Sequence, residues 1–164
     1  ALWTTGSDGS GGGDEHLCGQ RVLRSRRGRA HAARAPGSAL KIRNVTVRDI
    51  RFPTSLQQDG SDALNLGDYS ATYVVLDTGT GLAGHGLTFT NGRGNEVVVA
   101  AVHALKHHLL GRSLDDIVAD MRSLYRDLTL DKQLRWLGPE KGILHMATGA
   151  LLNAVWDLWA RRDG

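Results

Sequence analysis

The alternation of apolar and polar residues predicts three β-strands in the first half of residues 40–164. Residues 41–52 alternate, with a change of face near Arg48 that predicts a bulge or a bend in the first strand. Residues 72–78 are rich in β-branched side chains, and a glycine-rich turn leads from them into residues 82–90. Because this turn is short, we expect the three strands to form an antiparallel meander.

Helical periodicity replaces strand periodicity after the third strand. Asn95 is a plausible N-cap, and the apolar residues that follow it lie on one helical stripe as far as Leu109. Ser113 and Asp116 have the spacing of a capping box, and apolar residues then recur at helical spacing as far as Leu128. These two stretches predict two amphipathic helices.

The last helix is predicted to be central to the domain. Residues 143–159 are apolar or small around most of the helix, which is typical of a buried helix, and Pro139 suits its first turn. Thr148 and Asp157 are among the polar residues that interrupt the run, so it does not predict a membrane span. The order of three strands and then three helices predicts an α+β fold, with the helices packed on the sheet.

Residues 1–38 differ in composition from the rest of the chain. They begin with a Gly/Ser-rich stretch and continue with an arginine-rich stretch at 21–34 that has no acidic residue. A disordered head is expected here, as a mitochondrial transit segment or as sequence not native to the domain. The head carries the excess of basic residues, since the net charge is +3 and residues 39–164 are balanced. Nucleic-acid binding by the domain is therefore not predicted.

Few residues suggest chemistry on their own. His103 and His107 have the spacing of helical metal ligands, but the glutamate of a zinc-protease helix is missing, and an exposed face with His108 alongside explains them. The Gly-Arg-Gly turn at 92–94 could hold an anion on free amides, although the signal is weak. The single cysteine excludes a disulfide framework and a cysteine-based metal site. The long polar loop at 53–70 is the most site-like feature, because loops of this length often bind ligands.

Two glycines flank His85 in the third predicted strand. Glycine within a strand marks a place where another backbone can approach closely. The small residues of the last helix would likewise let other backbones approach that helix. We therefore expect close packing between Gly84, Gly86 and another element.

Four stretches carry a resemblance to a known family. They are VRDIRFPTS at 47–55, GSDALNLGDYSATYVVLDT at 60–78, GLTFTNGRGNEVV at 86–98 and QLRWLGPEKGILHMATGALLNAVWDLWA at 133–160. With them, residues 41–164 resemble the amino-terminal capping domain of the enolase superfamily, in its mandelate-racemase-like branch. Within that branch they are most similar to the L-fuconate dehydratases and their vertebrate mitochondrial relatives.

The resemblance implies a division of labour between two domains. The cap closes over a β/α barrel, which supplies the acid–base groups and the carboxylates that bind Mg²⁺ for the dehydration of an acid sugar. These 164 residues do not include such a barrel, so no catalytic residue and no metal ligand is expected in them, and the chain by itself is expected to be inactive. Its expected partners are an acid sugar and the barrel, self-association stays open, and the location is mitochondrial or cytoplasmic.

The resemblance also implies which residues contact the substrate. Gly60, Ser61 and Asp62 match a triplet that contacts the sugar acid, and Tyr69 matches a tyrosine that does so. Asp62 would accept hydrogen bonds from sugar hydroxyls, and the Tyr69 phenol could donate or accept one. The alternative for Tyr69 is that it starts a strand and packs. The alternative for the whole chain is a small non-enzymatic α+β interaction domain with a basic tail.

Overall fold

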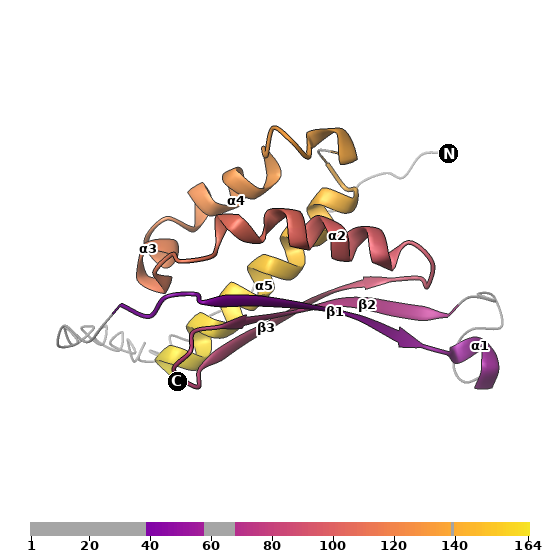
Figure 1. Cartoon of the computed structure of the whole chain (residues 1–164), viewed down its shortest axis with the longest axis horizontal. Coiled ribbons are helices and arrows are strands. Elements are labelled where there is room, and N and C mark those ends of the chain that lie inside the picture. Colours follow the sequence, from indigo (N-terminus) through magenta and orange to yellow (C-terminus); the bar gives the residue numbers. More distant parts are fainter. Residues whose placement is uncertain (1–38, 58–67, 139) are drawn as a thin grey trace, which may run out of the picture. The chain divides into compact units, whose positions relative to one another are not determined.

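A computed structural model describes residues 39–57, 68–138 and 140–164. They belong to a compact unit that spans Pro36–Gly164. Strands β1 (Asn44–Phe52), β2 (Tyr69–Asp77) and β3 (Ala83–Thr90) form an antiparallel sheet in the order β1-β2-β3, which confirms the predicted meander (Figure 1). The predicted head at 1–38 lies outside the described residues, as does Pro139.

The register between β1 and β2 is unbroken, so the predicted bulge near Arg48 is wrong. The pairing runs continuously from Asn44 opposite Asp77 to Phe52 opposite Tyr69. The apolar residues change face for another reason. The side of β1 that faces the helices carries Val45 over the core, but further along it carries Asp49, which bonds to polar groups at the start of a helix.

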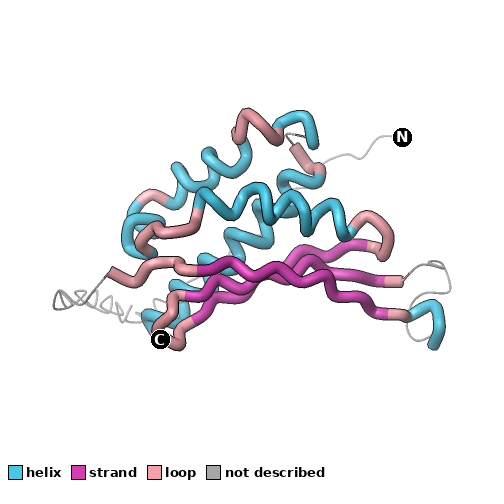
Figure 2. The backbone as a smooth tube through the Cα atoms, viewed as in Figure 1, coloured by secondary structure: helices cyan, strands magenta, loops and turns pink. Residues whose placement is uncertain are grey.

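The helices that follow β3 gather on one side of the sheet, whereas the short helix α1 (Thr54–Gln57) lies beyond the end of β1 (Figure 2). The helices after β3 are α2 (Asn95–Leu105), η1 (Lys106–His108), α3 (Leu114–Ala119), α4 (Met121–Thr129), η2 (Arg135–Leu137) and α5 (Ile143–Asp163). Four α-helices thus follow the sheet among the described residues, where the sequence predicts three. None of the described helices is long and apolar enough to cross a membrane.

The extra helix arises because the predicted second helix is broken at Asp120. This residue has φ −140° and ψ 66°, and its carboxylate accepts the Ser123 amide proton at 2.9 Å, so it ends α3 and caps α4. A short acidic side chain competes for backbone groups in this way. The apolar stripe is nevertheless as predicted, since Leu114, Ile117 and Leu124 are buried.

Both predicted N-caps are corrected. Ser113 stands at the N-cap position of α3 but makes no side-chain capping bond, so the capping box does not form. Gly94 is the N-cap of α2, and Asn95 is its first residue. The Asn95 side chain is buried and bonds to the sheet instead of to its own helix.

Helix α5 is the central helix of the unit, as predicted. Its buried residues are Leu144, Ala147, Thr148, Ala150, Leu151, Ala154, Val155 and Leu158. Burial is not complete around the helix, because Trp156 is 50% exposed. The side chain of Asp157 accepts the His85 amide proton of β3 at 2.8 Å, which ties the helix to the edge strand.

The close approach expected at the glycines of β3 is confirmed. A Cβ on Gly86 would collide with the backbone of α5 at Ala150 and Ala154, and one on Gly84 would collide with Ala154 and Leu158. The strand and the helix therefore lie backbone to backbone, and only glycine fits these two strand positions.

Candidate functional site

The long loop and the Gly-Arg-Gly turn leave the sheet at the same end. Phe52 at the end of β1 pairs with Tyr69 at the start of β2, and Ser70 pairs with Thr90 at the end of β3. The segment after β1 and the turn after β3 therefore lie at the same end of the sheet, on either side of β2, although they are far apart in sequence (Figure 1). We refer to this part of the molecule as the loop end.

A buried serine fixes the turn after β3. The Ser70 hydroxyl lies 2.6 Å from the Thr90 hydroxyl and accepts the Gly92 amide proton at 2.7 Å. Gly92 has φ +75°, and a Cβ there would lie 2.9 Å from the carbonyl oxygen of Asp68. The turn thus packs directly against the last residues of the long loop, and a side chain at position 92 would separate them.

Asn95 ties the start of α2 to all three strands. Its amide oxygen accepts hydrogen bonds from Thr72 at 2.7 Å and from Thr90 at 2.8 Å. Its amide nitrogen donates to Asp49 of β1 and, at 3.3 Å, to the carbonyl of Ala71 in β2. All four hydrogen-bonding positions of the amide are used, as a buried polar side chain requires.

Arg51 completes the network on the solvent side. Its guanidinium makes two bonds of 2.6 Å to the Asp49 carboxylate, one of 2.8 Å to Glu96 and one of 2.6 Å to the Gly92 carbonyl. The bond from Arg51 lowers the pKa of Asp49. The pKa of Glu96 is lowered by its own backbone amide and then by Arg51, and the pKa of Arg51 is raised by both acids. Strand, turn and helix are thereby held together by charge-assisted bonds.

Two of the three amides of the Gly-Arg-Gly turn are already bonded to side chains. The Gly92 amide donates to Ser70, and the Gly94 amide donates to the Glu96 carboxylate at 3.2 Å. A cavity of about 440 Å³ lies beside the turn instead, with Arg93 among its lining residues. Ile143 and Met146 of α5 also line it, and sequence reasoning missed both because they are distant in the chain.

The predicted substrate contacts are only partly within the described residues. Gly60, Ser61 and Asp62 lie outside them. Tyr69 is the first residue of β2, is half-buried, and its ring lies 5.2 Å from that of Phe89. Tyr69 therefore stands at the loop end and packs on the face of the sheet opposite the helices.

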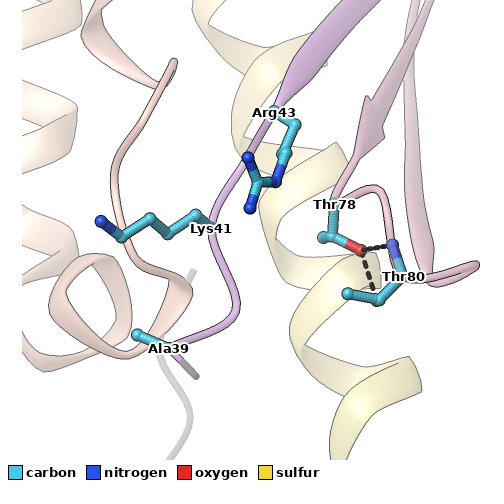
Figure 3. A pocket seen from close by; sticks show the side chains of 5 residues that line it. All are labelled: Ala39, Lys41, Arg43, Thr78 and Thr80. Carbon is cyan, nitrogen blue, oxygen red and sulfur yellow. Dashed lines mark hydrogen bonds between the residues drawn. The ribbon is translucent and has the colours of Figure 1, made fainter.

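A second hollow lies at the other end of the sheet, at the turn between β2 and β3. It has a volume of about 430 Å³ and is lined by Ala39, Lys41, Arg43, Thr78 and Thr80 (Figure 3). The Thr78 hydroxyl lies 2.8 Å from that of Thr80 and donates to the carbonyl of Leu82 at 2.6 Å. The two threonine hydroxyls thus bond within the turn and stabilise it, and we assign them no ligand.

The fold is that of an enolase-superfamily amino-terminal domain. Residues 65–164 match the family model described as "Mandelate racemase / muconate lactonizing enzyme, N-terminal domain". The chain belongs to this family, which confirms the resemblance found in the sequence.

Two curated relatives show which members of the family this chain is similar to. The chain is 58% identical over 127 residues to human "Mitochondrial enolase superfamily member 1", across 76% of this chain and 29% of the relative. It is 53% identical over 125 residues to the "L-galactonate dehydratase" of Hypocrea jecorina, across 76% of this chain and 28% of the relative. The chain thus spans less than a third of the length of these curated relatives.

Solved structures agree with the fold. The crystal structure of the human protein superimposes with a TM-score of 0.72 at 57% identity, covering 77% of this chain and 29% of that one. A racemase from Streptomyces coelicolor A3(2) with bound magnesium superimposes with a TM-score of 0.59 at 25% identity, covering 74% of this chain and 32% of that one. The family thus includes a dehydratase of sugar acids and a magnesium-bound protein.

Proposed function

We propose that this chain is the substrate-closing cap of a Mg²⁺-dependent acid-sugar dehydratase. The observation that carries the proposal is the 53% identity to an L-galactonate dehydratase in a chain whose structure brings the long loop and the turn after β3 to one end of the sheet. In this function the cap excludes water and recognises the sugar, and the rest of the whole protein performs the chemistry.

The described residues do not fit a magnesium site at the loop end. Mg²⁺ is held by carboxylates and other oxygens that are free to coordinate it. Asp49 and Glu96, two of the carboxylates described there, are bonded to Arg51, and Asp49 also accepts from Asn95. A third, Asp68, has an interaction of its own and is not free. We therefore assign no metal ligand to the loop end and place Mg²⁺ on the rest of the whole protein.

The substrate contacts of the proposal are Gly60, Ser61, Asp62 and Tyr69. Asp62 accepts hydrogen bonds from sugar hydroxyls. Tyr69, at the start of β2, donates or accepts a hydrogen bond to the sugar through its phenol. The particular substrate that we propose is L-fuconate, which is L-galactonate without the terminal hydroxyl. The rigid network of Ser70, Asn95 and Arg51 keeps the two segments in register while the long loop contacts the substrate.

The mitochondrial name of the human relative supports a mitochondrial location for the whole protein. The arginine-rich, acid-free stretch at 21–34 supports the same location by composition. A cytoplasmic location is the alternative.

A graft tests the proposed function. Residues 41–164 would replace the matching part of the Hypocrea jecorina dehydratase, and Mg²⁺-dependent turnover of L-galactonate and L-fuconate would be measured. We expect an active graft, and no turnover by the 164-residue chain alone. Asp62→Ala should lower kcat/KM of the graft about tenfold to hundredfold, because a hydrogen bond to a charged group contributes roughly 1.5–3 kcal/mol.

Asp59→Ala is the matched control, since it also removes an aspartate carboxylate from the long loop but should leave kcat/KM unchanged. Melting temperatures of the graft variants separate a lost contact from a lost fold. A folded graft whose kcat/KM is the same with and without Asp62 would refute the assignment of the sugar contact to this loop.

A further inference from the structure

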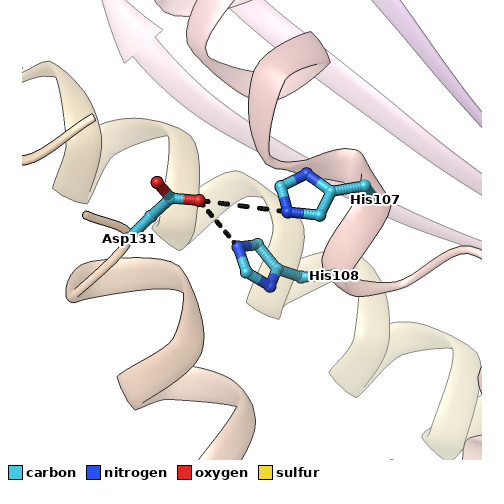
Figure 4. Close-up of side chains that lie close together, drawn as sticks. All are labelled: His107, His108 and Asp131. Carbon is cyan, nitrogen blue, oxygen red and sulfur yellow. Dashed lines mark hydrogen bonds and ion pairs between the residues drawn. The ribbon is translucent and has the colours of Figure 1, made fainter. Parts of the chain in front are cut away.

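Two histidines and an aspartate converge on the helical side of the domain, away from the loop end. His107 and His108 belong to η1 at the end of α2, and Asp131 lies in the link between α4 and η2 (Figure 4). The Asp131 Oδ2 atom is 2.9 Å from His108 Nε2 and 3.9 Å from His107 Nε2. The three candidate ligand atoms all lie within 4.8 Å of one another.

Two of the three side chains are oriented by a second bond. His107 Nδ1 lies 2.8 Å from the carbonyl oxygen of Ala104. A carbonyl can only accept, so the Nδ1 atom carries the proton, and the Nε2 atom of the neutral ring presents its lone pair to Asp131. The other oxygen of Asp131 accepts the Gln133 amide proton at 2.8 Å, which turns Oδ2 toward the imidazoles. Bonds of this kind fix the orientation of metal-binding histidines and carboxylates in proteins.

The cluster is sheltered but can be reached from solvent. The side chain of Asp131 is 10% exposed and that of His108 is 20% exposed, while that of His107 is 63% exposed. Arg112 is a neighbouring cation; it lies 3.9 Å from Asp127, and it reaches the backbone carbonyl of His108 rather than its ring. An ion could therefore enter on the His107 side, with its charge balanced by a partly buried carboxylate.

We propose that His107, His108 and Asp131 bind a divalent transition-metal ion of the Zn²⁺ class through two imidazole nitrogens and one carboxylate oxygen. Imidazole donors favour zinc, copper and nickel, whereas Mg²⁺ and Ca²⁺ prefer sites made of oxygen. Three protein ligands leave the fourth tetrahedral position to water. The bound ion joins the end of α2 to the link after α4.

The spacing of the donor atoms suits such an ion after a small movement. Metal–ligand bonds of about 2.0–2.1 Å place two donors on a tetrahedral ion roughly 3.3 Å apart. The two distances to Asp131 Oδ2, 2.9 Å and 3.9 Å, lie on either side of that value. A small shift of the exposed His107 side chain would bring the longer distance toward that value.

Titration of the metal-free 164-residue chain with Zn²⁺ by calorimetry tests the site, with Co²⁺ absorption as an independent report on coordination. We expect His107→Ala and Asp131→Asn each to weaken Zn²⁺ binding at least tenfold and to reduce the intense visible bands of tetrahedral Co²⁺. Asp131→Asn keeps the shape of the side chain and can still accept the Gln133 amide proton, so the fold should survive.

His103→Ala is the matched control, because it removes an exposed histidine of α2, four residues before His107, and leaves the cluster intact. It should not change Zn²⁺ affinity. The site is overturned if His107→Ala binds Zn²⁺ as tightly as the original chain, or if His103→Ala loses as much affinity. Because His107 is exposed, its variant decides the question even if Asp131→Asn fails to fold.

Discussion

At the scale of single residues, the loop end depends on side chains that bond across the sequence. Asn95 is the clearest case, since an asparagine at the start of a helix suggests an N-cap, yet here its amide bonds to strands instead. Arg51 has the same role at the surface, where it holds Asp49, Glu96 and the Gly92 carbonyl together. These residues position the loop end.

Arg51 should make stability depend on pH in the acid range. The pKa values of Asp49 and Glu96 are lowered in the folded chain, so their contribution is present above the ordinary carboxylate pKa of about 4 and is lost as pH falls through the lowered values. We expect Arg51→Gln to destabilise the chain at pH 7, and the difference from the original chain to shrink toward pH 3. Urea unfolding at both pH values measures this.

Arg48→Gln is the control for that measurement, because Arg48 lies on the same strand and points to the opposite face. It should change the free energy of unfolding equally, and only slightly, at both pH values. A difference for Arg51→Gln that is the same at pH 7 and pH 3 would contradict the role given to the network.

At the scale of elements, the contact between β3 and α5 sets the position of the sheet against the helices. Both partners use small residues, Gly84 and Gly86 on the strand and Ala150 and Ala154 on the helix. Cores of this density tolerate added volume poorly. The edge strand, and with it the turn at the loop end, therefore follows any movement of α5.

Gly86→Ala should destabilise the domain by about 1–3 kcal/mol or more, because the new methyl group collides with the α5 backbone. Gly149→Ala is the opposite case within the helix itself. Apart from the adjacent backbone of α5 itself, no atom lies within 4 Å of the added Cβ there, so the better helix former should stabilise the chain by about 0.5–1 kcal/mol. Denaturant unfolding of both variants measures the contrast, and similar effects of the two would refute the close packing.

At the scale of the whole molecule, the domain presents several large apolar side chains to solvent, including a group on the sheet and a tryptophan on α5. Phe52, Leu87 and Phe89, each about half exposed, lie on the sheet face opposite the helices. Trp156 is 50% exposed on α5, while the Trp159 indole donates to Asp163 and is partly covered. Apolar patches of this kind mark surfaces that contact other protein.

We expect the 164-residue chain to self-associate in solution through this apolar surface. Size-exclusion chromatography with light scattering should show species larger than a monomer, together with binding of a hydrophobic dye. Phe89→Ser combined with Trp156→Ser should reduce both signals, and Leu56→Ser, which removes an exposed leucine of α1 beyond the sheet, serves as the control. A clean monomer that binds no dye would contradict the expectation.

The sequence by itself determined the order of strands and helices, the buried stripe of each helix and the family. Apolar periodicity is a local property, so residues such as Leu114, Ile117 and Leu124 could be assigned to the core without knowing what covers them. The glycines of β3 likewise predicted that another backbone approaches the strand closely, but they did not identify that backbone as α5. The break at Asp120 was missed because a single capping aspartate does not disturb the apolar period.

Only the tertiary structure decided which distant residues meet. Asn95 and Asp49 are 46 residues apart, and His108 and Asp131 are 23 apart. The short windows over which periodicity and capping are judged therefore contain neither pair. The sequence placed His107 with His103 by helical spacing, but the chain turns into η1 there and directs His107 toward Asp131 instead. Periodicity reports which side of an element is buried, whereas hydrogen-bond and ligand partners depend on how the elements pack, and packing is fixed only when the whole chain folds.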